Sequence, residues 1–340
     1  MKAWESNIRK VEPYVPGEQP KVQNVIKLNT NENPYGPSEN VRKAMEAIDI
    51  DRCRLYPDPD VTKLVGSIAD YYGMDNNQVF VGVGSDDVLS MCFLTFFNGK
   101  KPVLFPDITY SFYSVWADLY RIPYEKQKLD DNMKIVPEDY YKENGGVIFP
   151  NPNAPTGLLM DLDSVVIVDE AYIDFGGVSA KDLVNEYDNV LVVQTFSKSR
   201  SMAGMRIGYA FGSKELIKAL NDVKFSFNSY TMNMTSIDMG VASINDKKYF
   251  EECVERITAT RERTKEELTK LGFTFPDSKA NFIFATHKSV PAKEIFEKLK
   301  DLNIFVRYFA QPGIDNYLRI TIGTDEQMDK LISALSEIVG

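Results

Sequence analysis

Six short apolar runs alternate with helix-like stretches between residues 79 and 212, and this alternation constrains the fold more than any other feature. The runs are VFVGVG (79–84), VLFPD (103–107), GVIFPNP (146–152), VVIVDEAY (165–172), VLVVQTFSK (190–198) and IGYAFG (207–212). Several are apolar throughout, which is typical of strands buried on both faces of a mostly parallel sheet. The sequence therefore predicts an α/β fold.

Helix signals complete this pattern and divide the chain. Ser85 opens the stretch SDDVLSMCFLTFF, and we expect it to be the N-cap of a helix. A long helix is expected from about Tyr249 to Gly272, and short strands and helices alternate after it. They are NFIFAT (281–286), PAKEIFEKLKDL (291–302), IFVRYF (304–309), YLRITIG (317–323) and DEQMDKLISALSEI (325–338). We expect a Pro-rich arm at 1–30 that joins the small domain or a dimer contact, a large domain at 31–245 and a small α+β domain at 246–340.

The connection between GVIFP and VVIVDE is short. We expect these strands to be parallel, and a parallel crossover needs a dozen or more residues and usually a helix. Only NPNAPTGLLMDLDS (151–164) lies between them, and five of its residues are the Pro, Asn and Gly of a turn-forming cluster. Either the connection is unusually short and has no helix, or a helix is missing from the chain, and the sequence is consistent with both explanations.

The charge balance argues against a polyanionic partner. Asp and Glu total 49 against 39 Lys and Arg, a formal net charge of −10, which disfavours nucleic acid although a few basic residues can hold a small anion. The start, MKAWESNIRK, lacks the apolar core of a signal peptide, and no apolar run is long enough to span a bilayer. We therefore expect a cytoplasmic protein that binds neither nucleic acid nor membrane.

The cysteines and the single histidine give no catalytic signal. Cys53, Cys92 and Cys253 are scattered and in no metal-ligand spacing, so we expect neither a disulfide framework nor a metal site. Cys92 and Cys253 lie in helical patterns and are expected to be buried. His287 follows NFIFAT, and we expect a solvated loop residue there rather than a catalytic one.

Chemistry-bearing residues follow the predicted strands, at the edge where open α/β sheets bind ligands. The GVGSDD turn (82–87) would present backbone N–H groups to an anion at a helix start, although such turns are also common without a ligand. Asp169 ends a buried strand, with Tyr172 three residues later. An acid in this place either caps the next element or serves a functional site.

Lys198 follows the strand VLVVQT and precedes Arg206 by eight residues. A surface lysine is the ordinary interpretation, yet hydroxyl side chains surround this one in sequence, namely Thr195, Ser197, Ser199 and Ser201. Hydroxyls and a bidentate arginine suit a phosphate, and a partly shielded lysine beside another cation favours its neutral, nucleophilic form. With a buried carboxylate, this set predicts pyridoxal 5'-phosphate, whose aldehyde forms a Schiff base with lysine and whose ring nitrogen pairs with an acid.

Motifs in a fixed order carry a family resemblance. They are LNTNENPYGPS (28–38), YPDPD (56–60), the Gly-x-Gly-Ser-Asp turn (82–86), NPNAPTG (151–157), VDEAYIDF (168–175) and SKSRSMAGMRIGYA (197–210). Over nearly its whole length the chain resembles the histidinol-phosphate aminotransferase family, fold-type I pyridoxal-phosphate enzymes with a large, mostly parallel-sheet domain and a smaller α+β domain. The last two motifs are the specific ones. The resemblance implies transamination of L-histidinol phosphate with 2-oxoglutarate, giving imidazole acetol phosphate and glutamate in histidine biosynthesis.

The resemblance also implies roles for the cofactor residues. Lys198 would form the Schiff base, Asp169 would pair with the pyridinium nitrogen, and Tyr172 would donate to the phenolic oxygen of the cofactor. Tyr110 would stack on the ring. The cofactor phosphate would be held by Thr195, Ser197, Arg206 and the backbone at Ser85 and Asp86. Tyr56 would reach the phosphate in the neighbouring subunit, which implies a homodimer with shared active sites.

Ala154 departs from the family pattern. Family members commonly have asparagine immediately before PTG, where its side chain bonds the phenolic oxygen, and alanine cannot make that bond. Either Tyr172 suffices or Asn153 takes over, and one neutral hydrogen bond contributes only about 1 kcal/mol. The departure therefore concerns cofactor tuning and leaves the class unchanged.

The substrate residues are also implied by the resemblance. Arg319 in YLRITIG matches the arginine that binds the α-carboxylate in aminotransferases, while Arg307 and Tyr14 match contacts to the phosphate-bearing part of histidinol phosphate. That substrate has no carboxylate, so both arginines would be free to serve its phosphate. A threonine-phosphate decarboxylase and an aromatic amino-acid aminotransferase are rival enzymes, and a catalytically silent aminotransferase-like sensor module is the alternative from another class.

Overall fold

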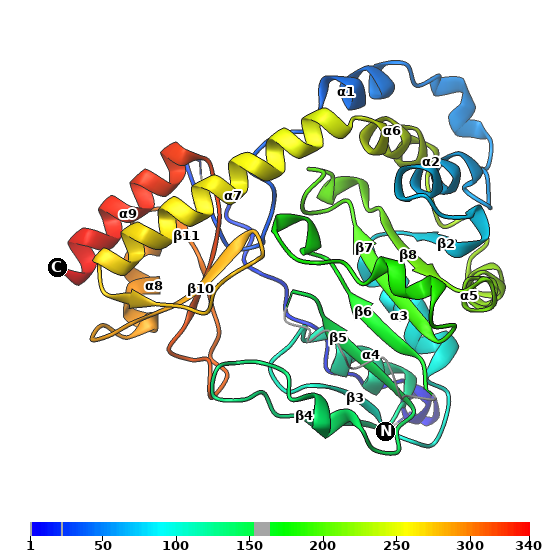
Figure 1. Ribbon diagram of the computed structural model, residues 1–340, viewed down its shortest axis with the longest axis horizontal. Helices are drawn as coiled ribbons and strands as arrows, with labels where there is room; N and C mark the ends of the chain where they lie inside the picture. Colours follow the sequence, from blue (N-terminus) through cyan, green and yellow to red (C-terminus); the bar gives the residue numbers. More distant parts are fainter. Residues whose placement is uncertain (1, 22, 153–163) are drawn as a thin grey trace.

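The computed structural model describes residues 2–21, 23–152 and 164–340 (Figure 1). Within these ranges seven strands form one sheet, in the order β2 (Val79–Gly82), β8 (Gly208–Gly212), β7 (Val190–Thr195), β6 (Val166–Asp169), β5 (Gly146–Pro150), β3 (Val103–Pro106) and β4 (Tyr124–Gln127). Every neighbouring pair is parallel except the two that contain β8. The predicted mostly parallel sheet is confirmed.

Both faces of this sheet are covered, which explains why its central strands are apolar throughout. Val166 and Val168 of β6 face one core, which α2 (Thr62–Tyr72) and α6 (Met234–Asn245) complete, while α1 (Glu39–Glu46) packs on α6. Ile167 faces the opposite core, which is shared with α3 (Ser85–Phe96), α4 (Phe112–Tyr120) and α5 (Lys214–Phe227).

β5 and β6 are parallel neighbours, with Pro150 opposite Asp169, as the sequence predicts. Only residues 151–165 connect them. Asn153 and Ala154, to which the sequence assigns a difference in cofactor binding, fall in 153–163 and lie outside the described residues.

The expected N-cap role of Ser85 is wrong. Ser85 is the first residue of α3, and the N-cap is Gly84, whose φ of +86° favours glycine. A Cβ at Gly208 would lie 2.3 Å from the Ser85 nitrogen, so β8 also packs directly against this turn. A helix that starts on a left-handed residue pressed against a strand leaves its first backbone N–H groups available to a ligand, because no side chain caps them.

The C-terminal part contains a second, antiparallel sheet. Its order is β12 (Arg307–Tyr308), β13 (Leu318–Thr321), β10 (Phe282–His287) and β9 (Phe273–Thr274), packed with α7 (Lys247–Lys270), α8 (Ala292–Asp301) and α9 (Asp325–Val339). β1 (Ile26–Lys27) pairs in parallel with β11 (Ile304–Phe305). In Figure 1, α7 runs from α6 beside the large sheet to α9 at the other end of the molecule.

The expectation for His287 is wrong. It is the last residue of β10, is 5% exposed, and pairs across the ladder with Phe273. Its Nε2 lies 3.0 Å from the Leu271 carbonyl oxygen, and its Nδ1 accepts from the Val290 N–H at 3.0 Å. The β9–β10 pairing buries a histidine that the sequence places in a loop, and its hydrogen bonds give it a structural role.

The remaining expectations concern burial and membrane association. Cys92 and Cys253 are buried, as predicted, and Cys53 is exposed. In the part of the chain that the structure describes, no helix is both long and apolar enough to cross a membrane. The same part contains no group of three or more His, Cys, Asp or Glu residues that could hold a metal ion.

Candidate active site

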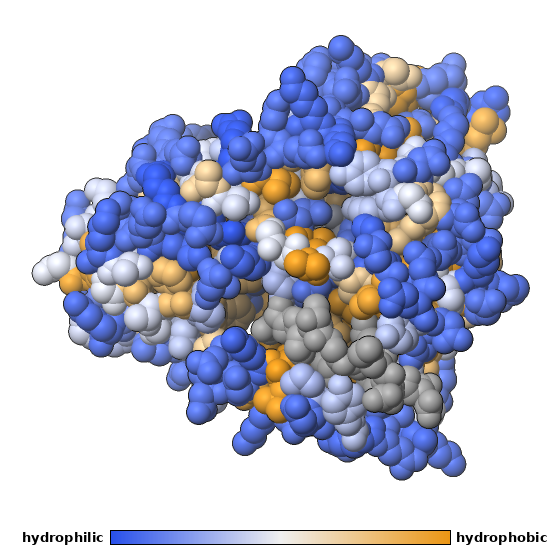
Figure 2. Space-filling model, in the orientation of Figure 1, coloured by the Kyte–Doolittle hydropathy of each residue, from blue (hydrophilic) through white to orange (hydrophobic). Residues whose placement is uncertain are grey.

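A cavity of about 900 Å³ lies where the carboxyl ends of β5, β6 and β7 meet the small sheet. In the view of Figure 2, hydrophobic residues gather along the junction of the two halves, while hydrophilic residues cover most of the remaining face. Predicted site residues that line the cavity are Tyr14, Ser85, Asp86, Tyr110, Asp169, Tyr172, Ser197, Lys198, Arg206, Arg307 and Arg319. The fold therefore brings together residues that are up to 305 positions apart in the chain.

Lys198 reaches this cavity from the loop after β7. Its Nζ donates to the Thr30 carbonyl oxygen at 3.3 Å and lies 5.7 Å from the centre of the Tyr172 ring. The hydroxyl of Tyr172 in turn accepts from the Asn31 side chain at 2.8 Å. The amine is thus placed beside a phenol whose oxygen already has a fixed donor.

Asp169 is buried at the end of β6, with one carboxylate face toward the cavity. Burial raises its pKa to about 6, against the opposing effect of hydrogen bonds from the Tyr113 hydroxyl (2.7 Å) and the Ala171 N–H (3.2 Å). A carboxylate held in this way can pair with a cationic ring nitrogen, because ionisation costs less when a positive charge lies next to it.

An anion cradle forms where the Gly84 turn meets Arg206. A Cβ at Gly84 would lie 2.5 Å from Arg206 Nη2, so a residue larger than glycine would displace the guanidinium group. Arg206 Nη2 lies 3.2 Å from the Asp86 carboxylate, which also accepts from the Tyr110 hydroxyl at 2.7 Å. Backbone N–H groups at the start of α3 and an arginine are thereby directed to the same place.

Ser197 completes the cradle, with Thr195 behind it. The hydroxyl of Thr195 donates toward Ser197 Oγ at 3.0 Å and accepts from the Ser197 N–H at 3.1 Å. Thr195 is absent from the described residues that line the cavity. Thr195 therefore holds Ser197 in place, and its own contact with the cofactor phosphate stays a prediction.

Two arginines lie side by side at the small-domain wall. Arg307 and Arg319 are direct partners in the β12–β13 ladder, and both line the cavity. Arg319 Nη2 donates to the Asn29 carbonyl oxygen at 2.9 Å, its Nε has no partner among the described residues, and burial lowers its pKa. Like charges directly opposite each other destabilise a sheet, so this pair favours an anion between them.

Tyr14 and Tyr56 have different surroundings. Tyr14, from the N-terminal arm, lines the cavity and stacks on Phe112 with ring centres 4.3 Å apart. Tyr56 is 81% exposed, stacks on Tyr230 at 4.6 Å, and is not among the described lining residues. A single chain thus does not bring Tyr56 into its own cavity.

Two residues of the site were missed from the sequence. Asn31 is 1% exposed and links Tyr172 to Thr321, whose hydroxyl donates to Asn31 Oδ1 at 3.0 Å. Tyr113 is fully buried below Asp169. The motif LNTNENPYGPS signals the first of these, because a polar run beside a buried leucine needs partners, whereas nothing local distinguishes Tyr113 from the other aromatic residues of its helix.

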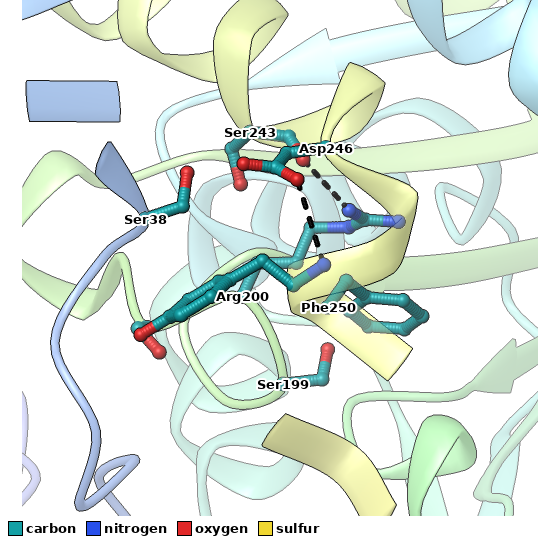
Figure 3. Close-up of a pocket in the computed structure, with 8 residues that line it drawn as sticks. Ser38, Ser199, Arg200, Ser243, Asp246 and Phe250 are labelled. Carbon is teal, nitrogen blue, oxygen red and sulfur yellow. Dashed lines mark hydrogen bonds between the residues drawn. The ribbon is translucent and has the colours of Figure 1, made fainter. Parts of the chain in front are cut away.

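A second, small cavity of about 10 Å³ lies behind the Lys198 loop (Figure 3). Arg200 is 5% exposed, donates to the Ser243 carbonyl oxygen at 3.1 Å and lies 4.1 Å from the centre of the Phe250 ring. The adjacent Ser199 hydroxyl donates to Asp174 at 2.5 Å. These contacts anchor the residues next to Lys198 to the end of α6, to the start of α7 and to the segment that follows Tyr172.

Comparison with known proteins gives a family and a fold. The model of the family described as aminotransferase class I and II matches residues 23–335. The chain is 51% identical over 349 residues to the histidinol-phosphate aminotransferase of Clostridium beijerinckii, covering 99% of this chain and 98% of the relative. It is 49% identical over 346 residues to that of Lactococcus lactis subsp. cremoris, covering 98% and 97%.

Solved structures share the architecture at lower identity. Histidinol-phosphate aminotransferase from Sinorhizobium meliloti, in complex with pyridoxal-5'-phosphate, has a TM-score of 0.82 at 22% identity and covers 92% of this chain and 90% of its own. The enzyme of the same name from Clostridium acetobutylicum has a TM-score of 0.82 at 24% identity, covering 92% and 99%. L-threonine-O-3-phosphate decarboxylase from Porphyromonas gingivalis has a TM-score of 0.76 at 21% identity, covering 92% and 99%. At these identities the likeness shows the fold, which is fold type I.

Proposed function

This chain belongs to the aminotransferase class I and II family, and we propose that it transfers the amino group of L-histidinol phosphate to 2-oxoglutarate, yielding imidazole acetol phosphate and glutamate in histidine biosynthesis. The curated relatives of about 50% identity over nearly the whole chain carry the name of this activity. The observation that carries the proposal is the Arg307–Arg319 pair in the same cavity as Lys198. Two adjacent cations fit a phosphate-bearing amine.

The cofactor is pyridoxal 5'-phosphate, and the described residues fit it. Asp169 is a buried acid that faces the cavity, and the close approach of Gly84 to Arg206 forms a cradle that any larger residue would fill. When bound, this group supplies an electron sink for the charge left after the α-proton of the substrate is removed. Asp169 would hold the proton on its ring nitrogen, while Arg206, Ser197 and the backbone at Ser85 and Asp86 would hold its phosphate.

Lys198 is the residue to which we assign covalent attachment and proton transfer. Its Nζ would take the proton from the substrate α-carbon as a general base and deliver it, as a general acid, to the carbon that carried the cofactor's aldehyde. The Thr30 carbonyl oxygen and the Tyr172 ring limit the directions in which the amine can point. Tyr172, with Asn31 as its fixed donor, would have its own hydroxyl proton free to donate to the phenolic oxygen, and Tyr110 would stack on the ring.

Arg307, Arg319 and Tyr14 would bind the substrate. The two arginines would share the phosphate of histidinol phosphate, and in the second half-reaction one of them would bind a carboxylate of 2-oxoglutarate. Tyr14 lies at the large-domain wall of the cavity, where its stacking on Phe112 fixes the N-terminal arm. The arm is held at the opposite wall as well, since Arg307 Nη2 donates to the Val15 carbonyl oxygen at 3.5 Å.

We further propose a homodimer in the cytoplasm, with domains at 31–245 and 246–340. The stacked pair of Tyr56 and Tyr230 is surrounded in sequence by other exposed apolar side chains, namely Ile50, Leu55, Phe225 and Phe227. Apolar residues of this size at the surface suit an interface with a second copy. Tyr56 would then reach the cofactor phosphate in the partner's cavity.

One substrate panel tests the function against its rivals. The purified chain, loaded with pyridoxal 5'-phosphate, is given histidinol phosphate, threonine phosphate or phenylalanine, each with 2-oxoglutarate, and both glutamate and carbon dioxide are measured. We expect glutamate with histidinol phosphate as the best substrate. Carbon dioxide released from threonine phosphate would identify a decarboxylase. A preference for phenylalanine would identify an aromatic amino-acid aminotransferase. No turnover of any of the three substrates would identify a catalytically silent sensor.

A further inference from the structure

Tyr113 connects the two groups that would hold the cofactor ring. It lies in the first turn of α4, and its hydroxyl donates to Asp169 Oδ2 at 2.7 Å. Its backbone N–H donates to the Tyr110 carbonyl oxygen at 3.1 Å, and the two tyrosine rings meet edge to face with centres 5.8 Å apart. Tyr110 lines the cavity, whereas Tyr113 is absent from the described lining residues. Tyr113 therefore reaches the site only through its neighbours.

The surroundings of Tyr113 fix where its hydroxyl points. The side chain is fully buried and packs against the rings of Phe93 and Phe105, with centres 6.4 and 5.9 Å away. An ionised carboxylate can only accept hydrogen bonds, so the phenol must be the donor. A donor held rigidly by aromatic packing stabilises the charged form of Asp169 over the protonated form.

The other groups around Asp169 do not take over this role. Apart from Tyr113, four titratable side chains among the described residues interact electrostatically with Asp169, so that the charge of one group shifts the pKa of the other. They are Asp86 and Cys92 of α3, Tyr110, and the adjacent Glu170. Asp86 and Glu170 both raise the pKa of Asp169, because a second negative charge nearby is unfavourable. Tyr113 and the Ala171 N–H are the donors that oppose burial and these two carboxylates.

We propose that Tyr113 is a positioning residue for the reaction: by donating to Asp169 Oδ2 it keeps this carboxylate ionised and oriented so that the remaining oxygen lone pairs face the cofactor ring nitrogen. The inference rests on the proposed use of pyridoxal 5'-phosphate. Without the phenol, Asp169 takes up a proton at a higher pH, and a neutral acid no longer favours the protonated ring nitrogen. Cofactor binding thus becomes sensitive to pH in a range where the unaltered protein is not.

Tyr113→Phe tests this, because it removes one oxygen and keeps the aromatic packing. The dissociation constant of pyridoxal 5'-phosphate is measured between pH 5.5 and 8.5 by the change in visible absorbance of the full-length chain. We expect the pH below which affinity falls to rise by about one unit, with roughly threefold weaker binding near pH 6.5, approaching tenfold near pH 5.5, and little change at pH 8.5. A purely structural defect would weaken binding equally at every pH.

Tyr140→Phe is the matched control. Tyr140 is also a buried tyrosine, its hydroxyl has no partner among the described residues, and it does not line the cavity. It should leave both the affinity and its pH dependence unchanged. The Asp169→Asn background supplies the second control, because Tyr113→Phe should cause no further pH shift once the titrating group is gone.

The outcomes separate this inference from the function on which it rests. If the unaltered chain fails to bind pyridoxal 5'-phosphate, the proposed function is wrong. If the unaltered chain binds pyridoxal 5'-phosphate but Tyr113→Phe binds it with the same pH dependence, the inference alone is overturned. The same holds if Tyr113→Phe shifts the pH dependence of binding equally in the Asp169→Asn background. Should Tyr113→Phe fail to fold, the double variant should regain folding, since a neutral amide is less costly to bury than a carboxylate that has lost its donor, and an unfolded double variant would contradict the proposal.

Discussion

The guanidinium group of Arg206 lies 3.2 Å from the carboxylate of Asp86, beside the glycine turn that would hold the cofactor phosphate. The arginine is thus already paired with an anion of the chain itself. A phosphate that enters the cradle must share Arg206 with Asp86 and approach a like charge. This relationship gives the first prediction.

Asp86→Asn should strengthen binding of pyridoxal 5'-phosphate. It removes the competing negative charge and keeps an oxygen that accepts from Tyr110. Partly exposed ion pairs contribute at most about 1 kcal/mol, so we expect the dissociation constant to fall by up to roughly fivefold in an absorbance titration. Asp277→Asn is the control, since Asp277 lines the same cavity but pairs with Lys265 and Lys279. Weaker binding in Asp86→Asn would show that the carboxylate helps to hold the cofactor.

Lys198→Ala should abolish the visible absorbance band that borohydride removes from the loaded enzyme. The substitution removes the amine that would attach the cofactor and transfer the proton, and general acid–base catalysis alone contributes about 10² to 10⁴ in rate. Spectra before and after borohydride, together with glutamate formation, provide the measurement. Lys279→Ala removes a different lysine of the same cavity and should keep the band. A borohydride-sensitive band that persists in Lys198→Ala would rule out its assigned role.

Arg307→Ala should raise KM for histidinol phosphate without lowering the melting temperature. A hydrogen bond to a charged group contributes about 1.5–3 kcal/mol, or roughly 10- to 150-fold in KM. The melting temperature should change little, because losing the long hydrogen bond to the Val15 carbonyl oxygen is offset by removing a charge opposite the like charge of Arg319. Arg263→Ala is the control, since Arg263 pairs with Asp325 and Asp329 and does not line the cavity. An unchanged KM in both Arg307→Ala and Tyr14→Phe would refute the proposed substrate.

Asn31→Ala should destabilise the protein by about 1–3 kcal/mol, because it leaves the buried Thr321 hydroxyl and the part-buried Tyr172 hydroxyl without their partner. The free energy of unfolding from urea titration gives the magnitude. Asn40→Ala removes an exposed asparagine whose amide bonds Asp246, and should change stability much less. Equal losses in the two variants would mean that the Tyr172 contact contributes nothing beyond a surface hydrogen bond.

Asp169→Asn should stabilise the cofactor-free protein at pH 8 and not at pH 4. The folded pKa of Asp169 is about 6, above its ordinary value of 3.8, so its contribution to stability is fully present below about pH 4 and is lost as the pH rises through 6. The difference between these two pKa values corresponds to about 3 kcal/mol in the free energy of unfolding. Urea unfolding at the two pH values measures it. Asp277→Asn should behave in the opposite way, because Lys265 lowers the pKa of Asp277.

The sheet and the main site could be predicted because the relevant signals are local. The run VLVVQT becomes β7, buried along its whole length, and Lys198 lies three residues after its end, so a parallel strand order is enough to bring the lysine to the ligand edge. Asp169 reaches the same edge for the same reason, since it is the last residue of β6.

The parts that could not be predicted depend on contacts between distant segments. Asn31 bonds Tyr172 across 141 positions, and Tyr113 bonds Asp169 across 56, and no spacing in the sequence encodes either pair. Ser85 looked like an N-cap, but a left-handed Gly84 in contact with β8 takes that position. Tyr56 stays a prediction because its proposed contact requires a second chain.

The pairing of β1 with β11 has a consequence for how this chain can be rearranged. Residues 26–27 supply a strand to a sheet whose other member lies at 304–305, so the C-terminal half is completed by the beginning of the chain. If residues 246–340 were expressed alone, the edge of β11 would be unpaired. The C-terminal hydrophobic core would also be exposed where the Leu28 side chain packs against it. Recombination with a homologous gene at one breakpoint near 245 would therefore join an arm from one parent to a domain from the other, and chimaeras should need two matched breakpoints to remain well packed.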